Sequence, residues 1–133
     1  MFGKGVYFAD MFAKSFAYAR RGYHQQESYL MLMCEVVLGK SREMNSAEYV
    51  ENLDYPFHSV KGCGRQGPGY KHTVTCPNGV KIPLGKVIEY HENEEQKRRL
   101  ITLSHNEYIV YNTSQIRMRY LVQIKKKKPQ KKQ

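Results

Sequence analysis

Tryptophan, closely spaced cysteine pairs and long apolar runs are all absent from this chain of 133 residues. The three cysteines are odd in number and lack Cys-x-x-Cys spacing, which argues for reduced thiols in an intracellular protein over a disulfide framework. No apolar run reaches the roughly 18 residues of a membrane span, and the first residues lack the charged-then-apolar order of a signal peptide. We therefore expect neither secretion nor a membrane partner.

The positive charge of the chain is concentrated at its C-terminal end. The formal net charge is +10, and six lysines fall within residues 125–133, so that subtracting six from ten leaves +4 for the rest. A body with this modest charge is not strongly marked as a nucleic-acid binder. We interpret the lysine-rich tail as a solvated end, a nuclear import signal or a weak contact to DNA.

Residue patterns in the first third predict a strand, a helix and a second strand. Residues 5–9 form a short β-branched and aromatic run. Asp10 can cap a helix that extends through Arg20, and Gly22 ends that helix. The nearly continuous apolar run over residues 29–38 is typical of a central strand buried on both faces.

The remaining sequence predicts loops and further strands. Glycine and proline punctuate residues 62–85, which favours loops and short edge strands. The charged stretch over residues 89–99 indicates a surface insertion. Residues 106–111 and 115–124 predict strands, and in the second of these only Leu121 breaks the alternation of apolar and polar residues. Strands outnumber helices, so we expect an α+β domain dominated by a sheet.

Two familiar binding motifs are excluded by their spacing. Gly39-Lys40-Ser41 follows a strand as the end of a phosphate-binding loop would, but Cys34 occupies the place of the required first glycine. Cys63, His72 and Cys76 share one loop region, yet they lack paired cysteines and an obvious fourth ligand for zinc. We therefore expect no phosphate loop and no metal site.

Three blocks of residues, in a fixed order, carry a more specific signal. Residues 3–11 read Gly-Lys-Gly-Val-Tyr-Phe-Ala-Asp-Met and are followed by Lys14-Ser15 and Tyr18. Residues 58–64 read His-Ser-Val-Lys-Gly-Cys-Gly, and residues 106–111 read Asn-Glu-Tyr-Ile-Val-Tyr. Together these blocks resemble the C-terminal part of the catalytic domain of poly(ADP-ribose) polymerases. The resemblance extends from residue 1 to about residue 124.

The resemblance implies a fold, an activity and a location. The implied fold is the α+β ADP-ribosyltransferase fold, a split, mainly antiparallel β-structure with a cleft for NAD, over residues 1–124. The implied activity uses NAD as substrate, releases nicotinamide and builds poly(ADP-ribose) on acceptor proteins, including the enzyme itself. The family also implies DNA repair in the nucleus, with the cytoplasm as the alternative, and DNA contact through upstream domains.

The same resemblance assigns roles to single residues. Glu107 corresponds to the catalytic glutamate, which bonds the ribose 2′-hydroxyl and stabilises charge at the anomeric carbon. Tyr7 corresponds to the active-site tyrosine that helps to hold the nicotinamide ribose. Tyr18 stacks on the nicotinamide, Ser15 bonds its carboxamide, and Lys14 lines the cleft. Gly5, Phe8 and Ala9 complete the expected NAD-binding set.

Two departures from the family pattern limit what we expect of the isolated chain. His105 stands where relatives carry tyrosine, near the site that receives the growing polymer, so polymer length or branching is expected to differ. The family's active-site histidine precedes a glycine, and none of the five histidines here does. We expect the upstream half of the domain to be missing, leaving 133 residues that bind NAD weakly or not at all, have little activity, and are poorly stable or aggregate. The alternative is a non-catalytic remnant that serves as a binding module.

Overall fold

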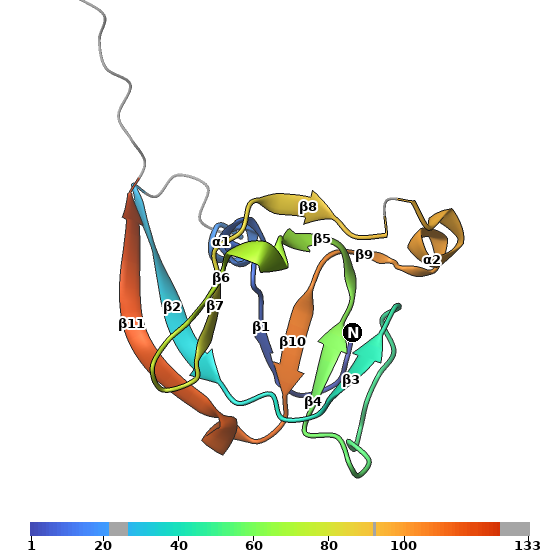
Figure 1. The fold of residues 1–133 in the computed structure, drawn as a ribbon. Helices are drawn as coiled ribbons and strands as arrows, with labels where there is room; N and C mark the ends of the chain where they lie inside the picture. The colour runs from blue at the N-terminus through green and yellow to red at the C-terminus, as the bar shows by residue number, and fades with distance from the viewer. Residues whose placement is uncertain (22–26, 92, 126–133) are drawn as a thin grey trace, which may run out of the picture.

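The structure is a computed structural model that describes residues 1–21, 27–91 and 93–125. Within these ranges the chain forms mostly antiparallel sheets, with two short α-helices, α1 (Phe12–Ala19) and α2 (Glu95–Leu100) (Figure 1). Two 3-10 turns, η1 (Tyr70–His72) and η2 (Thr113–Gln115), separate strands. The observed elements are consistent with the predicted α+β class.

A four-stranded sheet lies at the centre of the fold and contains both strands of the predicted site. Its order is β1 (Val6–Phe8), β10 (Glu107–Val110), β4 (Ser59–Gly62) and β3 (Ser41–Met44). Strand β10 is antiparallel to both of its neighbours, whereas β3 and β4 are parallel. Glu107, the first residue of β10, therefore belongs to a strand that hydrogen bonds hold on both sides.

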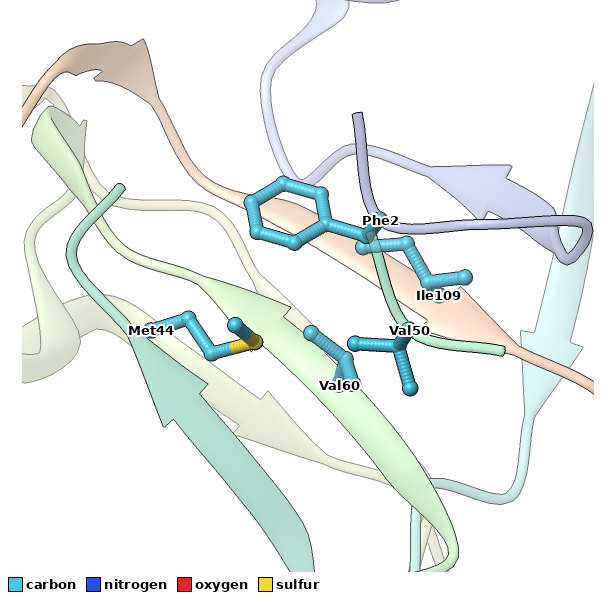
Figure 2. Packing of buried hydrophobic residues seen from close by; sticks show 5 residues of the cluster. All are labelled: Phe2, Met44, Val50, Val60 and Ile109. Carbon is cyan, nitrogen blue, oxygen red and sulfur yellow. The ribbon is translucent and has the colours of Figure 1, made fainter. Parts of the chain in front are cut away.

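One cluster of buried side chains packs against this sheet. Its members are Phe2, Met44, Val50, Val60 and Ile109 (Figure 2). The Tyr111 hydroxyl donates a 2.6 Å hydrogen bond to the Phe2 carbonyl and so ties the first residues of the chain to the end of β10. Phe2 lies four residues before β1 begins at Val6, so this cluster anchors the segment that leads into β1.

Strands β2 (Ser28–Val36) and β11 (Ile116–Lys125) form a long antiparallel pair beside the central sheet. The prediction that residues 29–38 form a central strand buried on both faces is wrong. Among the described residues β2 pairs with β11 alone, and Leu30 and Leu32 are about as exposed as solvent-facing side chains, at 61% and 58%. A continuous apolar run indicates a strand, but it does not say how many neighbours cover that strand.

Helix α1 contacts one face of β2, where the Phe16 ring meets the buried Tyr29 ring edge-on at 5.3 Å. The pairing register of β11 shifts between Met118 and Tyr120, as in a β-bulge. Leu121, which breaks the alternation of apolar and polar residues, follows this shift and is 66% exposed.

Two smaller sheets form the region rich in glycine and proline. Strand β5 (Gly64–Pro68) lies between β8 (Val87–Glu89) and β9 (Leu103–His105), and β6 (Thr73–Thr75) pairs with β7 (Lys81–Pro83). The prediction of short strands here is confirmed, although β5 is a central strand and not an edge strand. Helix α2 lies within the predicted surface insertion, and all of its residues are at least partly exposed.

The predicted N-terminal cap of the first helix is wrong. Helix α1 begins at Phe12 after Met11, and no side chain caps it. The Asp10 carboxylate instead accepts hydrogen bonds from Asn106 and Tyr108, so it does not cap the main-chain amides at the start of α1. The helix ends at Ala19, and the predicted stop at Gly22 lies outside the described residues, as does the tail from Lys126 onward.

In the part of the chain that the structure describes, neither helix has the length and apolar character that a bilayer crossing demands.

Replacing Ile109 by alanine tests the cluster in Figure 2. Ile109 is fully buried, so we expect Ile109→Ala to lower the free energy of unfolding by about 2–5 kcal/mol. Leu30→Ala, at a side chain that is 61% exposed, serves as the control and should stay within about 0.5 kcal/mol of the parent protein. Urea unfolding measures both, and equal losses would contradict the assignment of the core.

Candidate active site

A cavity of about 530 Å³ opens between the β1–α1 segment and the start of β10. Its volume lies within the range of roughly 300–1,000 Å³ that is usual for small-molecule sites. The lining residues are Met1, Tyr7, Phe8, Ala9, Lys14, Ser15, Tyr18 and Glu107. The structure thus brings together every residue that we placed in the site except Gly5, and it adds Met1.

Glu107 is a buried carboxylate with one cationic partner. Its Oε1 lies 2.5 Å from the Lys14 Nζ, and the two side chains are only 4% and 13% exposed. The Lys14 ammonium also donates to the main-chain oxygen of His105 at 3.3 Å. Glu107 Oε2 is buried and has no hydrogen-bond partner among the described residues. Since an unsatisfied buried oxygen is costly, this atom is suited to accept a hydrogen bond from a bound ligand.

Tyr7 contributes its ring to the cavity and its hydroxyl to the turn before β1. The hydroxyl accepts a 3.0 Å hydrogen bond from the Phe2 amide and donates a 2.9 Å bond to the Gly3 carbonyl. Burial is the main cause that raises the pKa of the Tyr7 hydroxyl above its usual value. One lone pair of the oxygen is left for a ligand, because the hydroxyl proton and the other lone pair are already used.

Ser15 and Tyr18 lie three residues apart on α1, so both can line the same side of the cavity. The Tyr18 ring is 51% exposed. The guanidinium carbon of Arg21 lies 5.0 Å from its centroid, at cation–π distance. An exposed aromatic ring at the rim of a cavity can stack on a flat ligand.

Gly5 has a structural reason for its place in the motif that does not involve the cavity. A Cβ atom on Gly5 would lie 2.4 Å from Ile109 Cγ2 and 2.9 Å from the Val110 carbonyl oxygen. A side chain would therefore push the start of β1 away from β10. Gly5 allows these two strands to approach closely, and it does not line the cavity.

Sequence reasoning missed a polar network beneath the cavity. Asp10 Oδ2 accepts hydrogen bonds from Asn106 Nδ2 and from the Tyr108 hydroxyl, each at 2.9 Å. Asn106 Oδ1 in turn accepts the Gly64 amide at 2.9 Å. Burial, followed by the charge of Asp10, raises the pKa of Tyr108 well above 10.0. The signal available in the sequence was the pair of polar residues on either side of Glu107 within one strand block.

The Gly39-Lys40-Ser41 segment leads into β3. Gly39 has a φ of 56°, and the Ser41 hydroxyl exchanges a 2.6 Å hydrogen bond with Ser59. Over residues 1–21, 27–91 and 93–125, no group of three or more His, Cys, Asp or Glu side chains is placed to hold a metal ion.

Comparison with known proteins shows the family to which the chain belongs. The family model described as "Poly(ADP-ribose) polymerase catalytic domain" matches residues 1–126. The chain is 43% identical to Poly [ADP-ribose] polymerase 2 of Arabidopsis thaliana, over 94% of the chain and 19% of that protein. It is 42% identical to Poly [ADP-ribose] polymerase 1 of Caenorhabditis elegans, over 94% of the chain and 13% of that protein.

Poly [ADP-ribose] polymerase 1 of Danio rerio gives a similar result, with 42% identity over 94% of the chain and 12% of that protein. The chain therefore belongs to the poly(ADP-ribose) polymerase family, whose members are ADP-ribosyltransferases. This confirms the family that the three sequence blocks predicted. The chain spans less than a fifth of the length of these relatives.

The raised pKa of Tyr108 predicts a sensitivity to alkaline pH. In the unfolded chain a tyrosine ionises near pH 10, whereas folded Tyr108 keeps its proton to higher pH. The contribution of Tyr108 to the free energy of unfolding is therefore complete below about pH 10 and is lost as the pH rises from there toward the pKa of the folded group. The free energy of unfolding should fall by about 1.4 kcal/mol per pH unit through this group. Tyr108→Phe should make the alkaline decline shallower by up to that amount. Urea unfolding at a series of pH values measures the slope, and an unchanged slope in the variant would contradict the prediction.

Proposed function

We propose that this chain provides the catalytic glutamate and the nicotinamide side of the active site in an NAD-dependent ADP-ribosyltransferase that builds poly(ADP-ribose). The observation that carries the proposal is the buried Glu107 carboxylate, which lines the 530 Å³ cavity with Oε1 paired and Oε2 without a partner. The residues around it provide an aromatic ring at Tyr18 and a hydroxyl at Ser15.

In the proposed reaction the bond between the nicotinamide nitrogen and the ribose anomeric carbon breaks, and nicotinamide leaves. The ribose becomes oxocarbenium-like, and a fixed carboxylate in a site that excludes water stabilises the positive charge. Glu107 Oε2 accepts a hydrogen bond from the ribose 2′-hydroxyl, while Oε1 stays in its ion pair with Lys14. An acceptor hydroxyl then attacks the anomeric carbon, and its proton is released to the solvent as the new carbon–oxygen bond forms. The same carboxylate can orient an acceptor hydroxyl during chain extension.

The nicotinamide group would lie against the β1–α1 segment. Tyr18 offers a ring for stacking, Ser15 a hydroxyl for the carboxamide, and Tyr7 a ring wall. The adenosine part of NAD would be held by the upstream half of the ADP-ribosyltransferase fold, which in this family carries the histidine-glycine pair.

Partners and location follow from the family and remain part of the proposal. Acceptor proteins, including the enzyme itself, would receive ADP-ribose in the nucleus, in connection with DNA repair. The lysine-rich residues 125–133 would add a nuclear import signal or a weak DNA contact. His105, whose main-chain oxygen accepts a hydrogen bond from Lys14, lies two residues before Glu107 and would influence polymer length or branching.

Removing the Glu107 charge should abolish most of the transfer. Glu107→Gln is nearly isosteric, and the loss of one preorganised group of this kind costs on the order of 10²–10³ in rate. The assay is transfer of labelled ADP-ribose from NAD by the protein at its full natural length. Glu43→Gln is the matched control, because the Glu43 side chain is 64% exposed and pairs with Lys61 outside the cavity. Full activity in Glu107→Gln would refute the proposed role.

Removing the Tyr18 ring should weaken nicotinamide binding. Aromatic stacking contributes about 0.5–1.5 kcal/mol beyond buried area, so Tyr18→Leu should raise the nicotinamide Kd roughly 2- to 13-fold. Calorimetry with nicotinamide measures this change. Tyr49→Leu, at a residue that is 60% exposed and does not line the cavity, provides the comparison. The same Kd in the Tyr18 and Tyr49 variants would place the nicotinamide elsewhere.

A further inference from the structure

We propose that Asp10 is a positioning residue that holds the nicotinamide side of the cavity in register with Glu107. The inference rests on the proposed function and adds to it a residue that does not line the cavity. Its basis is the place of Asp10 in the chain, directly between β1 and α1, and the two hydrogen bonds that its carboxylate accepts from residues on both sides of Glu107.

The Asp10 carboxylate joins two parts of the site that are far apart in sequence. Its Oδ2 accepts hydrogen bonds from Asn106 Nδ2 and from the Tyr108 hydroxyl, each at 2.9 Å. These donors lie 96 and 98 residues after Asp10 in the sequence. Tyr7, Phe8 and Ala9 precede Asp10, and all of them line the cavity. The segment that would bind nicotinamide is thus attached to the catalytic strand at Asp10.

A second attachment acts on the other face of the same strand. Successive side chains of a strand point to opposite faces, so Tyr108 and Glu107 face opposite sides of β10. Lys14, four residues after Asp10, pairs with Glu107. The short segment from Asp10 to Lys14 therefore holds β10 from both faces, and this double attachment fixes the distance between α1 and the Glu107 carboxylate.

The network is anchored in the sheets and not in a mobile side chain. The Asn106 side chain is only 1% exposed. Its Oδ1 accepts a hydrogen bond from the Gly64 amide of β5, and its Nδ2 donates one to Asp10. A Cβ atom on Gly64 would lie 2.2 Å from the carbonyl carbon of His105, the last residue of β9, so β5 approaches β9 as closely as a glycine permits just before Asn106. Asp10 thus receives its hydrogen bond from a group with a fixed position.

The chemistry of Asp10 favours positioning over stability. Its Oδ1 is buried and has no hydrogen-bond partner among the described residues. A buried carboxylate with an unsatisfied oxygen contributes little net stability, and the best-attested use of such groups is to specify one arrangement. The arrangement specified here is the alignment of α1 with β10.

The experiment compares Asp10→Ala with Asp10→Asn in the protein at its full natural length, and follows kcat and KM for NAD in the transfer assay. Asp10→Ala removes the acceptor for both donors, and a displacement of about 1 Å can cost on the order of 10² in rate. We expect kcat to fall roughly 10- to 100-fold, with KM changed less than about 3-fold, because Tyr7, Ser15 and Tyr18 stay on one continuous segment. Asp10→Asn keeps an acceptor oxygen and should recover most of kcat.

Asp54→Ala is the matched control, since Asp54 is an exposed carboxylate away from the cavity. An unchanged kcat in Asp10→Ala would overturn the inference, as would equal losses in kcat and NAD affinity or a failure of Asp10→Asn to restore kcat. If Asp10→Ala does not fold, Tyr108→Phe tests the inference through the same comparison of kcat with KM for NAD, because it removes one hydrogen-bond donor to Asp10 and keeps the ring. If the unsubstituted protein transfers no ADP-ribose, the proposed function itself fails and this inference fails with it.

Discussion

A carboxylate that is removed from water must find a cation or hydrogen-bond donors, and this constraint organises the site around Glu107. Glu107 is 4% exposed, and its charge is paired with Lys14 at 2.5 Å. Lys14 belongs to α1, so the ion pair fixes the helix against the start of β10. The pairing of β1 with β10 and the Asp10 network fix the same helix from its N-terminal side. The cavity lies between the β1–α1 segment and Glu107, which these contacts hold in place.

Local pattern and motif were sufficient to predict the site strands and most of the cavity. Residues 106–111 read as a strand because β-branched and aromatic residues dominate them, and β10 occupies residues 107–110. Tyr7, Ser15, Tyr18 and Glu107, which the family resemblance assigned to one site, line one cavity. The roles proposed for these residues depend on side-chain type, so a short stretch of sequence carries their signal.

Other features could not be predicted, because they depend on contacts between distant segments. Asp10 has the residue type and place of a helix cap, and only the packing of β10 beside it shows that Asn106 and Tyr108 take its carboxylate instead. Gly5 looks like part of a ligand-binding loop, yet its role is to let β1 approach Ile109. For β2 the sequence predicted the strand but not its single described neighbour, since apolar residues alone do not reveal what covers them.

The most direct test of the account is a crystal structure of the protein, at its full natural length, with an NAD analogue whose bond between nicotinamide and ribose cannot be cleaved. The account predicts that Glu107 Oε2 lies within about 2.5–3.0 Å of the ribose 2′-hydroxyl, that Lys14 remains on Oε1, and that the nicotinamide ring stacks on Tyr18. A ribose bound away from Glu107, with Oε2 still lacking a partner, would contradict it.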